Sequence, residues 1–119
     1  MNIGKIGLEG EKRVAHFLRQ RGFNVIKRNY QCRYGEIDII AENDEYILFV
    51  EVKTRKENAL ISGVDAVDAK KQSKITLTAQ DYIVKTNCQK QPRFDVAEVT
   101  VKEKAEGFGF SLKYIENAF

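Results

Sequence analysis

The chain has 119 residues, a single proline and no compositionally biased tract, which fits one folded domain over 1–119 and excludes a disordered or fibrous protein. No apolar run approaches the roughly 20 residues of a membrane span. The net charge is +3, with eight basic and two acidic residues in 1–33, which fits contact with a polyanion as well as a solvated helix face. The two separated cysteines argue against a zinc site and, with no secretory signal in view, indicate free thiols in a cytoplasmic protein.

The first part of the chain predicts a helix followed by three strands. Apolar residues at helical spacing and a stop at Gly22 indicate a helix over 3–21. Its apolar stripe consists of Leu8, Val14, Ala15 and Leu18. Strands are expected over 23–31, 35–42 and 46–54, with a hairpin turn at residues 43–45.

The rest of the chain predicts a second helix and two more strands. After a loop over 55–63, a helix is expected over 64–85. Its inward stripe consists of Val64, Val67, Lys71, Ile75, Thr78, Ala79 and Tyr82. Strands over 93–102 and 108–115 follow, joined by a turn at 106–107. The order α-β-β-β-α-β-β predicts an α/β fold with a mixed central sheet and helices on its faces.

Three charged residues of the second and third strands are the candidate catalytic residues. Strand alternation places Glu51 and Lys53 on the face that carries Ile47 and Phe49. Either hairpin register then places Asp38 on that face, within roughly 5–8 Å of Glu51. The opposite face is expected to carry Ile37, Ile39 and Ala41. Ordinary charges on a solvated sheet face are the alternative, but apolar neighbours on the same face favour a paired or metal-binding role.

Two carboxylates and a lysine at this spacing suit the hydrolysis of phosphodiesters. Carboxylate oxygens are the ligands that Mg²⁺ prefers, and Mn²⁺ accepts the same set. Such a cation polarises the phosphate and makes bound water more acidic. Lys53 is expected to orient or deprotonate that water and to offset charge in the transition state.

The same residues resemble a known motif. Asp38 followed by Glu51-Val52-Lys53, on a hairpin after an N-terminal helix, resembles the PD-(D/E)xK nuclease superfamily, although the proline of that motif is absent. Over nearly its full length the chain resembles the YraN family of small bacterial endonuclease-like proteins. The matching stretches are Gly7-Leu8-Glu9-Gly10-Glu11 with Ala15 and Leu18, Arg28-Asn29-Tyr30, Gly35-Glu36-Ile37-Asp38-Ile39-Ile40, Phe49-Val50-Glu51-Val52-Lys53-Thr54-Arg55, Lys71-Gln72-Ser73-Lys74 with Ala79 and Tyr82, Arg93-Phe94-Asp95-Val96 and Asn117-Ala118-Phe119.

The resemblance implies a restriction endonuclease-like core, similar also to archaeal Holliday junction resolvases. It implies that Asp38, Glu51 and the Val52 carbonyl hold the metal and that Lys53 positions the attacking water. Glu11 is expected to reach the metal from the first helix, and a capping or salt-bridge role is its equal alternative.

The expected nucleic-acid contacts are Arg55, Lys71, Gln72 and Lys74. The alternatives are a loop charge for Arg55 and, for Lys71, a side-chain stem that lies along the core.

The expected function is Mg²⁺- or Mn²⁺-dependent cleavage of nucleic acid, with DNA preferred over RNA and branched or damaged DNA included. One alternative is a nucleic-acid-binding module with the nuclease fold and little cleavage activity, acting with a protein partner. Another is a protein-interaction domain that uses the basic helix. No membrane partner is expected. A homodimer is expected by analogy with relatives that cut two strands.

Overall fold

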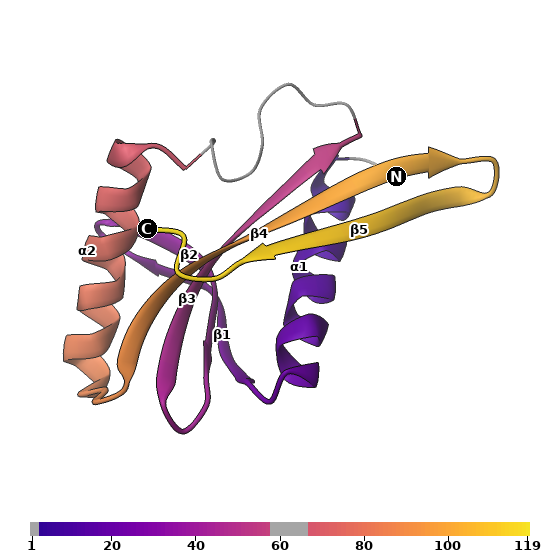
Figure 1. Ribbon diagram of the computed structural model, residues 1–119. Helices are drawn as coiled ribbons and strands as arrows, with labels where there is room; N and C mark the ends of the chain where they lie inside the picture. Colours follow the sequence, from indigo (N-terminus) through magenta and orange to yellow (C-terminus); the bar gives the residue numbers. More distant parts are fainter. Residues whose placement is uncertain (1–2, 58–66) are drawn as a thin grey trace.

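Within the described residues, 3–57 and 67–119 of a computed structural model, two helices lie on opposite faces of a five-stranded sheet (Figure 1). The elements are α1 (Ile3–Gln20), β1 (Asn24–Cys32), β2 (Gly35–Glu42), β3 (Tyr46–Lys56), α2 (Ala69–Thr86), β4 (Gln91–Lys104) and β5 (Gly107–Ile115). The strands lie in the order β1-β2-β3-β4-β5. Only β3 and β4 pair in parallel, so the mixed sheet and the α-β-β-β-α-β-β order are confirmed.

Helix α1 covers one face of the sheet. Val14, Ala15 and Leu18 are buried against side chains from β2, β3 and β4. Leu8 is 54% exposed, contrary to the predicted stripe, and Ile6 is buried instead. Helical spacing alone does not account for this exchange, because at a rotation of about 100° per residue Ile6 and Leu8 both lie roughly 80–120° from Val14 and Leu18 around the helix.

Helix α2 covers the other face and begins later than predicted. It starts at Ala69, because the Asp68 carboxylate accepts the backbone N–H of Lys71 at 2.9 Å and caps the helix. The predicted start at residue 64 is therefore wrong. Val64 lies outside the described residues, and Val67 is buried although it precedes the helix.

The two strands that pair in parallel, β3 and β4, are both longer than predicted. Strand β3 continues to Lys56, where a loop was expected from residue 55. Its pairing with β4 runs from Tyr46↔Gln91 to Lys56↔Val101, so each strand supplies backbone partners that extend the other. The pairing of β4 with β5 continues to Lys104↔Gly107.

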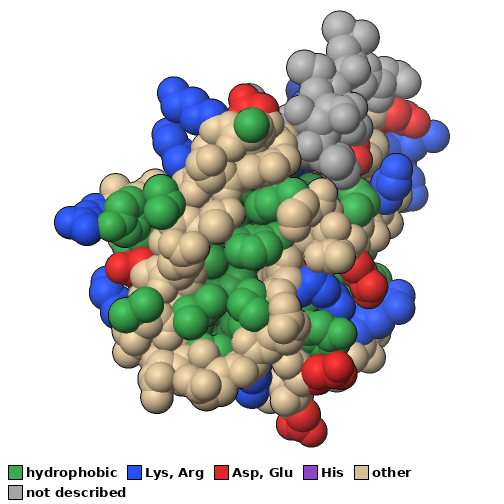
Figure 2. All heavy atoms as spheres, turned by 60° about the vertical axis from the view of Figure 1, so that its left-hand side comes forward, with side chains coloured by type: hydrophobic (Ala, Val, Ile, Leu, Met, Phe, Trp, Pro, Cys, Tyr) green, Lys and Arg blue, Asp and Glu red, His purple; other side chains and the backbone are tan. Residues whose placement is uncertain are grey.

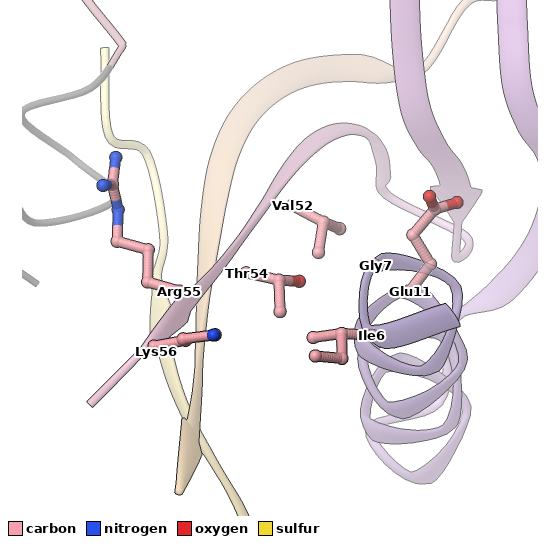
Figure 3. Close-up of a pocket in the computed structure, with 7 residues that line it drawn as sticks. All are labelled: Ile6, Gly7, Glu11, Val52, Thr54, Arg55 and Lys56. Atoms are coloured by element: carbon pink, nitrogen blue, oxygen red, sulfur yellow. The ribbon is translucent and has the colours of Figure 1, made fainter. Parts of the chain in front are cut away.

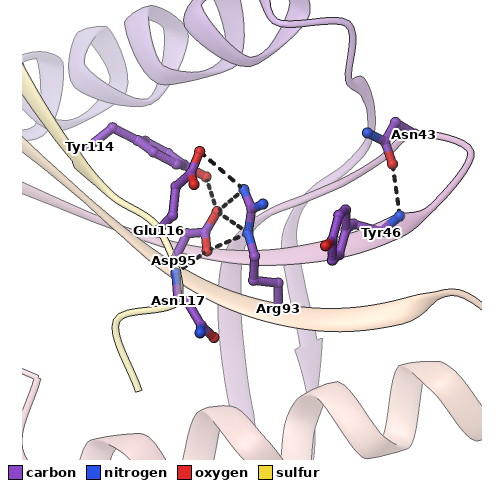
Figure 4. Close-up of polar contacts among 7 residues, drawn as sticks. All are labelled: Asn43, Tyr46, Arg93, Asp95, Tyr114, Glu116 and Asn117. Carbon is purple, nitrogen blue, oxygen red and sulfur yellow. Dashed lines mark hydrogen bonds and ion pairs between the residues drawn. The ribbon is translucent and has the colours of Figure 1, made fainter.

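A fully buried acid ties the C-terminal end of the chain to the sheet (Figure 4). Asp95 accepts hydrogen bonds from the Arg93 guanidinium, from the Tyr114 hydroxyl at 2.6 Å and from the Asn117 backbone N–H at 2.9 Å. All these partners belong to β4, β5 and the C-terminal residues, so the Asp95 carboxylate has a structural role. In the same view the Asn43 side chain accepts the N–H of Tyr46 and closes the predicted hairpin turn.

The C-terminal residues complete the core beside α2. Phe119 stacks on Phe94 with ring centroids 5.3 Å apart, and Phe94 stacks in turn on Phe49. Hydrophobic side chains gather on the face of the molecule that Figure 2 shows. Leu77 and Val84 of α2 are exposed. Among the described residues, no helix is long and apolar enough to cross a membrane.

Candidate active site

The candidate site lies where β2 and β3 separate. Their backbone pairing ends at Ile39↔Val50. Beyond this pair, the Asp38 carboxylate accepts the backbone N–H of Val52 at 2.8 Å. The side chain of Asp38 thus takes the place of a backbone carbonyl of β2 as the acceptor for this N–H. The same register places Asp38 opposite Glu51, as the sequence predicted.

The alternation of β2 breaks at this position. Ile39 packs in the core on the α1 side, whereas Ile37 packs with Ile40 in the core on the α2 side. The prediction that Ile37 and Ile39 share a face is therefore wrong. The break occurs where Asp38 turns toward the β3 backbone, because that hydrogen bond directs its side chain along the sheet.

Glu51 is the central group of the site. Its residue is only 6% exposed, and its Oε2 is buried without a hydrogen-bond partner. Burial and the neighbouring charge of Asp38 raise the pKa of Glu51 to about 7, while Lys71 and Lys53 act in the opposite direction. At neutral pH the buried acid therefore holds its charge poorly, and an additional cation would stabilise the charged form.

Two lysines from different elements converge on one oxygen of this acid. The Nζ atoms of Lys53 on β3 and Lys71 on α2 lie 3.6 Å and 3.5 Å from Glu51 Oε1. Partial burial lowers the pKa of Lys71, but the contacts with Glu51, Lys53 and Asp38 together outweigh it, so that the pKa of Lys71 is raised. Lys53 and Lys71, which are far apart in the sequence, therefore belong to one cluster around Glu51, and the catalytic role of Lys53 stays a prediction.

Glu11 approaches from the α1 side. Its side chain is 16% exposed, and its Oε1 lies 3.5 Å from Arg28 Nη2 without hydrogen-bond geometry. Burial and then the charge of Asp38 raise the pKa of Glu11, against Arg28 and Asn29. The salt-bridge alternative for Glu11 is thus realised, and the effect of the Asp38 charge on its pKa shows that Glu11 lies close to the site. The pairing of Glu11 with Arg28 could not be predicted, because an ion pair between different elements leaves no periodic pattern in the sequence.

The donor set fits a hard divalent cation. Among the described residues, no three His, Cys, Asp or Glu side chains form a complete metal cage. Mg²⁺ does not need one, because it keeps several waters and uses one or two carboxylates. Asp38 and Glu51 would supply these carboxylates, and the Oε2 of Glu51 is buried without a hydrogen-bond partner. The Val52 carbonyl as a third ligand stays a prediction.

The residues expected to contact nucleic acid have different surroundings. Arg55 has a buried Nε without a hydrogen-bond partner, so its guanidinium is partly unsatisfied. Gln72 donates to the Val67 carbonyl at 3.0 Å and supports the start of α2. Lys74 is exposed on α2, close to Gly35 at the end of the β1–β2 hairpin. Their contacts with nucleic acid stay predictions.

The sequence was also compared with known proteins. Residues 10–99 match the model of the uncharacterised protein family UPF0102. A UPF0102 protein of Clostridium acetobutylicum is 41% identical over 116 residues, which cover 97% of this chain and 93% of that protein. A relative from Caldanaerobacter subterraneus is 44% identical over 100 residues, covering 83% and 82% of the two chains. One from Dictyoglomus turgidum is 38% identical over the whole of both chains. These descriptions state a family and no activity.

Proposed function

The chain belongs to the UPF0102 family, as its YraN-like motifs indicated, and we propose that it is a metal-dependent nuclease that hydrolyses phosphodiester bonds in DNA, including branched or damaged DNA. The proposal includes the restriction endonuclease-like character of the α/β core. The observation that carries it is the environment of Glu51. A buried acid beside Asp38, with an unpartnered oxygen and two lysines, is an arrangement that a solvated sheet face would not require.

The proposed roles follow from the positions of the side chains. Asp38, Glu51 and the Val52 carbonyl would hold Mg²⁺ or Mn²⁺, and the Val52 N–H fixes the Asp38 carboxylate in place. When bound, the cation supplies Lewis-acid polarisation of the phosphate and a more acidic water.

The two lysines act on the attacking water and on the phosphate. Lys53 orients the attacking water. Lys71 offsets negative charge on the phosphate once Glu51 binds the cation and no longer pairs with this lysine. Arg55, Gln72 and Lys74 lie on the same two elements as these lysines, β3 and α2, and we assign them contacts with flanking phosphates.

One observation favours a second candidate function. Both lysines are paired with Glu51, and no third acid completes a cage among the described residues. The same surface could therefore bind nucleic acid without cutting it and act with a protein partner. In that case binding would weaken steeply with salt and would not need a divalent cation.

Incubation of the purified full chain with a panel of substrates separates the two functions. The panel contains linear duplex, single-stranded, flapped and four-way DNA and a matched RNA, each with Mg²⁺, Mn²⁺ or chelator. The nuclease proposal expects cleavage only with the cation, reduced roughly 100-fold or more in Asp38→Asn and Lys53→Met.

Matched controls change equivalent groups away from the site. Asp44→Asn alters an exposed acid in the hairpin turn, and Lys113→Met alters an exposed lysine on β5. Both should cleave as the unmodified protein does. Cleavage that persists in Asp38→Asn would rule out the proposed site, and salt-sensitive binding with no cleavage would establish the second candidate.

A further inference from the structure

A cavity of about 420 Å³ lies beside the candidate site, between the first turns of α1 and the outer half of β3 (Figure 3). It is lined by Ile6, Gly7, Glu11, Val52, Thr54, Arg55 and Lys56. The helix and the strand approach closely here, since a Cβ atom at Gly10 would overlap the Thr54 hydroxyl. The cavity is therefore bounded by two regular elements in direct contact.

The cavity shares two wall residues with the site. Val52 donates its N–H to Asp38, and Glu11 responds to the charge of Asp38. In Figure 3 the Glu11 carboxylate and the Arg55 guanidinium both point away from the space between Ile6 and Thr54. A molecule in the cavity would therefore lie next to Glu11 without displacing it, on the α1 side of β3, while Glu51 on the same strand faces α2.

The remaining wall has the chemistry of a site for a flat polar ring with an anionic group. Ile6 and Val52 provide aliphatic surface, and Thr54 adds a hydroxyl that can donate or accept. The Lys56 side chain extends toward Ile6 and Thr54 in Figure 3 and brings a positive charge. The volume lies in the range of ordinary small-ligand pockets, roughly 300–1,000 Å³.

We propose that this cavity binds one unpaired nucleotide of the DNA strand, next to the phosphodiester that is cut. The inference rests on the proposed nuclease function, and it specifies the substrate as DNA with an unstacked nucleotide at the cleavage position. The base lies between the aliphatic walls, and Lys56 pairs with the adjoining phosphate.

A continuous duplex does not fit this description. The bases of a duplex are stacked and paired, and proteins read them by inserting a helix or strand into a groove. In this protein the base must instead leave the stack and enter the pocket. A mismatch, bulge, flap or junction lowers the cost of extruding a nucleotide, because pairing and stacking are already lost there. The cavity thus selects damaged or branched DNA by its shape.

The first test measures nucleotide binding without any reaction. Metal-free protein with labelled methyl groups is titrated with dAMP and dCMP into the millimolar range, and the Ile6 and Val52 methyl signals are followed by NMR. Gly7→Phe fills the cavity, since a Cβ at Gly7 meets nothing within 4 Å, and Gly7→Ala is its small control.

We expect the methyl signals of both residues to shift. The affinity for the nucleotide should fall about tenfold or more in Gly7→Phe and in Lys56→Glu, which alters an exposed residue. Gly7→Ala and Lys113→Glu should bind as the unmodified chain does. Unmoved methyl signals, equal binding by all variants, or the same shifts with inorganic phosphate alone would overturn the proposal.

The second test measures substrate choice with Mg²⁺. Duplexes with one unpaired nucleotide should be cut faster than fully paired duplexes, and Gly7→Phe should reduce that preference about tenfold. An unchanged preference overturns the cavity inference and leaves the nuclease in place. Absence of cleavage on every substrate overturns the nuclease proposal, while the metal-free titration still decides whether the cavity binds a nucleotide.

Discussion

The Asp38 carboxylate accepts the backbone N–H of Val52 at 2.8 Å, at the point where β2 and β3 stop pairing. This bond fixes the acid by the backbone of the neighbouring strand, so its position does not depend on a flexible surface rotamer. Glu51 immediately precedes Val52, and the same contact therefore sets two acids side by side. The electrostatic behaviour of the site follows from this arrangement.

Replacement of Asp38 should separate its structural role from its charge. Asp38→Asn retains a side-chain oxygen that can accept the Val52 N–H, so stability should change little. Asp38→Ala leaves that N–H without its partner and should lower the free energy of unfolding by about 1–3 kcal/mol. Urea denaturation measures the difference. Equal stability of the two variants would contradict the structural role of this hydrogen bond.

The pKa of Glu51 predicts how stability depends on pH. In metal-free protein its folded pKa of about 7 lies above the ordinary glutamate value of about 4.3, so the folded state binds the proton more tightly than the unfolded chain. The stabilisation is fully present below the ordinary value and is lost as the pH rises through 7. The melting temperature in chelator should therefore fall between about pH 5 and pH 8.

Glu51→Gln is the control for this dependence. It removes the titrating group and should flatten the fall in melting temperature over that interval. If the variant keeps the full slope of the unmodified protein, another group titrates there and the raised pKa of Glu51 is wrong.

Lys53 and Lys71 should each lower the pKa of Glu51, the acid with which both are paired. Lys53→Met and Lys71→Met remove charges that lower the pKa of Glu51, so each substitution should raise that pKa further. The carboxyl carbon of Glu51, followed by NMR titration, reports the change. Lys85→Met, which removes an exposed lysine paired with Asp81, should leave the titration unaltered. An unshifted titration in both site variants would contradict the convergence on Glu51.

Asp95 should behave as a structural acid. Asp95→Asn weakens the ion pair between the fully buried Asp95 carboxylate and the partly buried Arg93, and it should reduce the free energy of unfolding by roughly 3–5 kcal/mol. Glu116→Gln alters the exposed acid of the same network and should have little effect. Chemical denaturation measures both, and Mn²⁺ affinity of the folded Asp95→Asn protein should match that of the unmodified chain. A loss of metal affinity would assign Asp95 to the site.

Much of the fold was predictable because its information is local. The alternation of β3 places Ile47, Phe49 and Glu51 on one face, as predicted, and the structure shows that α2 covers this face. The beginning of α2 was not predictable from its stripe, because Val64 and Val67 continue the helical spacing before Asp68. The capping bond of Asp68 decides the boundary, and capping competes with periodicity only once the backbone geometry is known.

The candidate site was only partly predictable for a related reason. The pairing of Asp38 with Glu51 followed from hairpin register, which two adjacent strands encode. The break at Ile37 follows from a bond between a side chain and a neighbouring backbone, which leaves no trace in the apolar pattern. The contacts of Glu11 with Arg28 and of Lys71 with Glu51 join distant elements, so packing alone reveals them.

The central claim is that Asp38 and Glu51 together capture a divalent cation. Anomalous diffraction from crystals soaked in Mn²⁺, collected for the unmodified chain and for Asp38→Asn, tests it most directly. The account predicts a manganese peak within bonding distance of both carboxylates, absent in the variant. A fully soaked crystal with no peak there, and with both lysines still on Glu51, would contradict it.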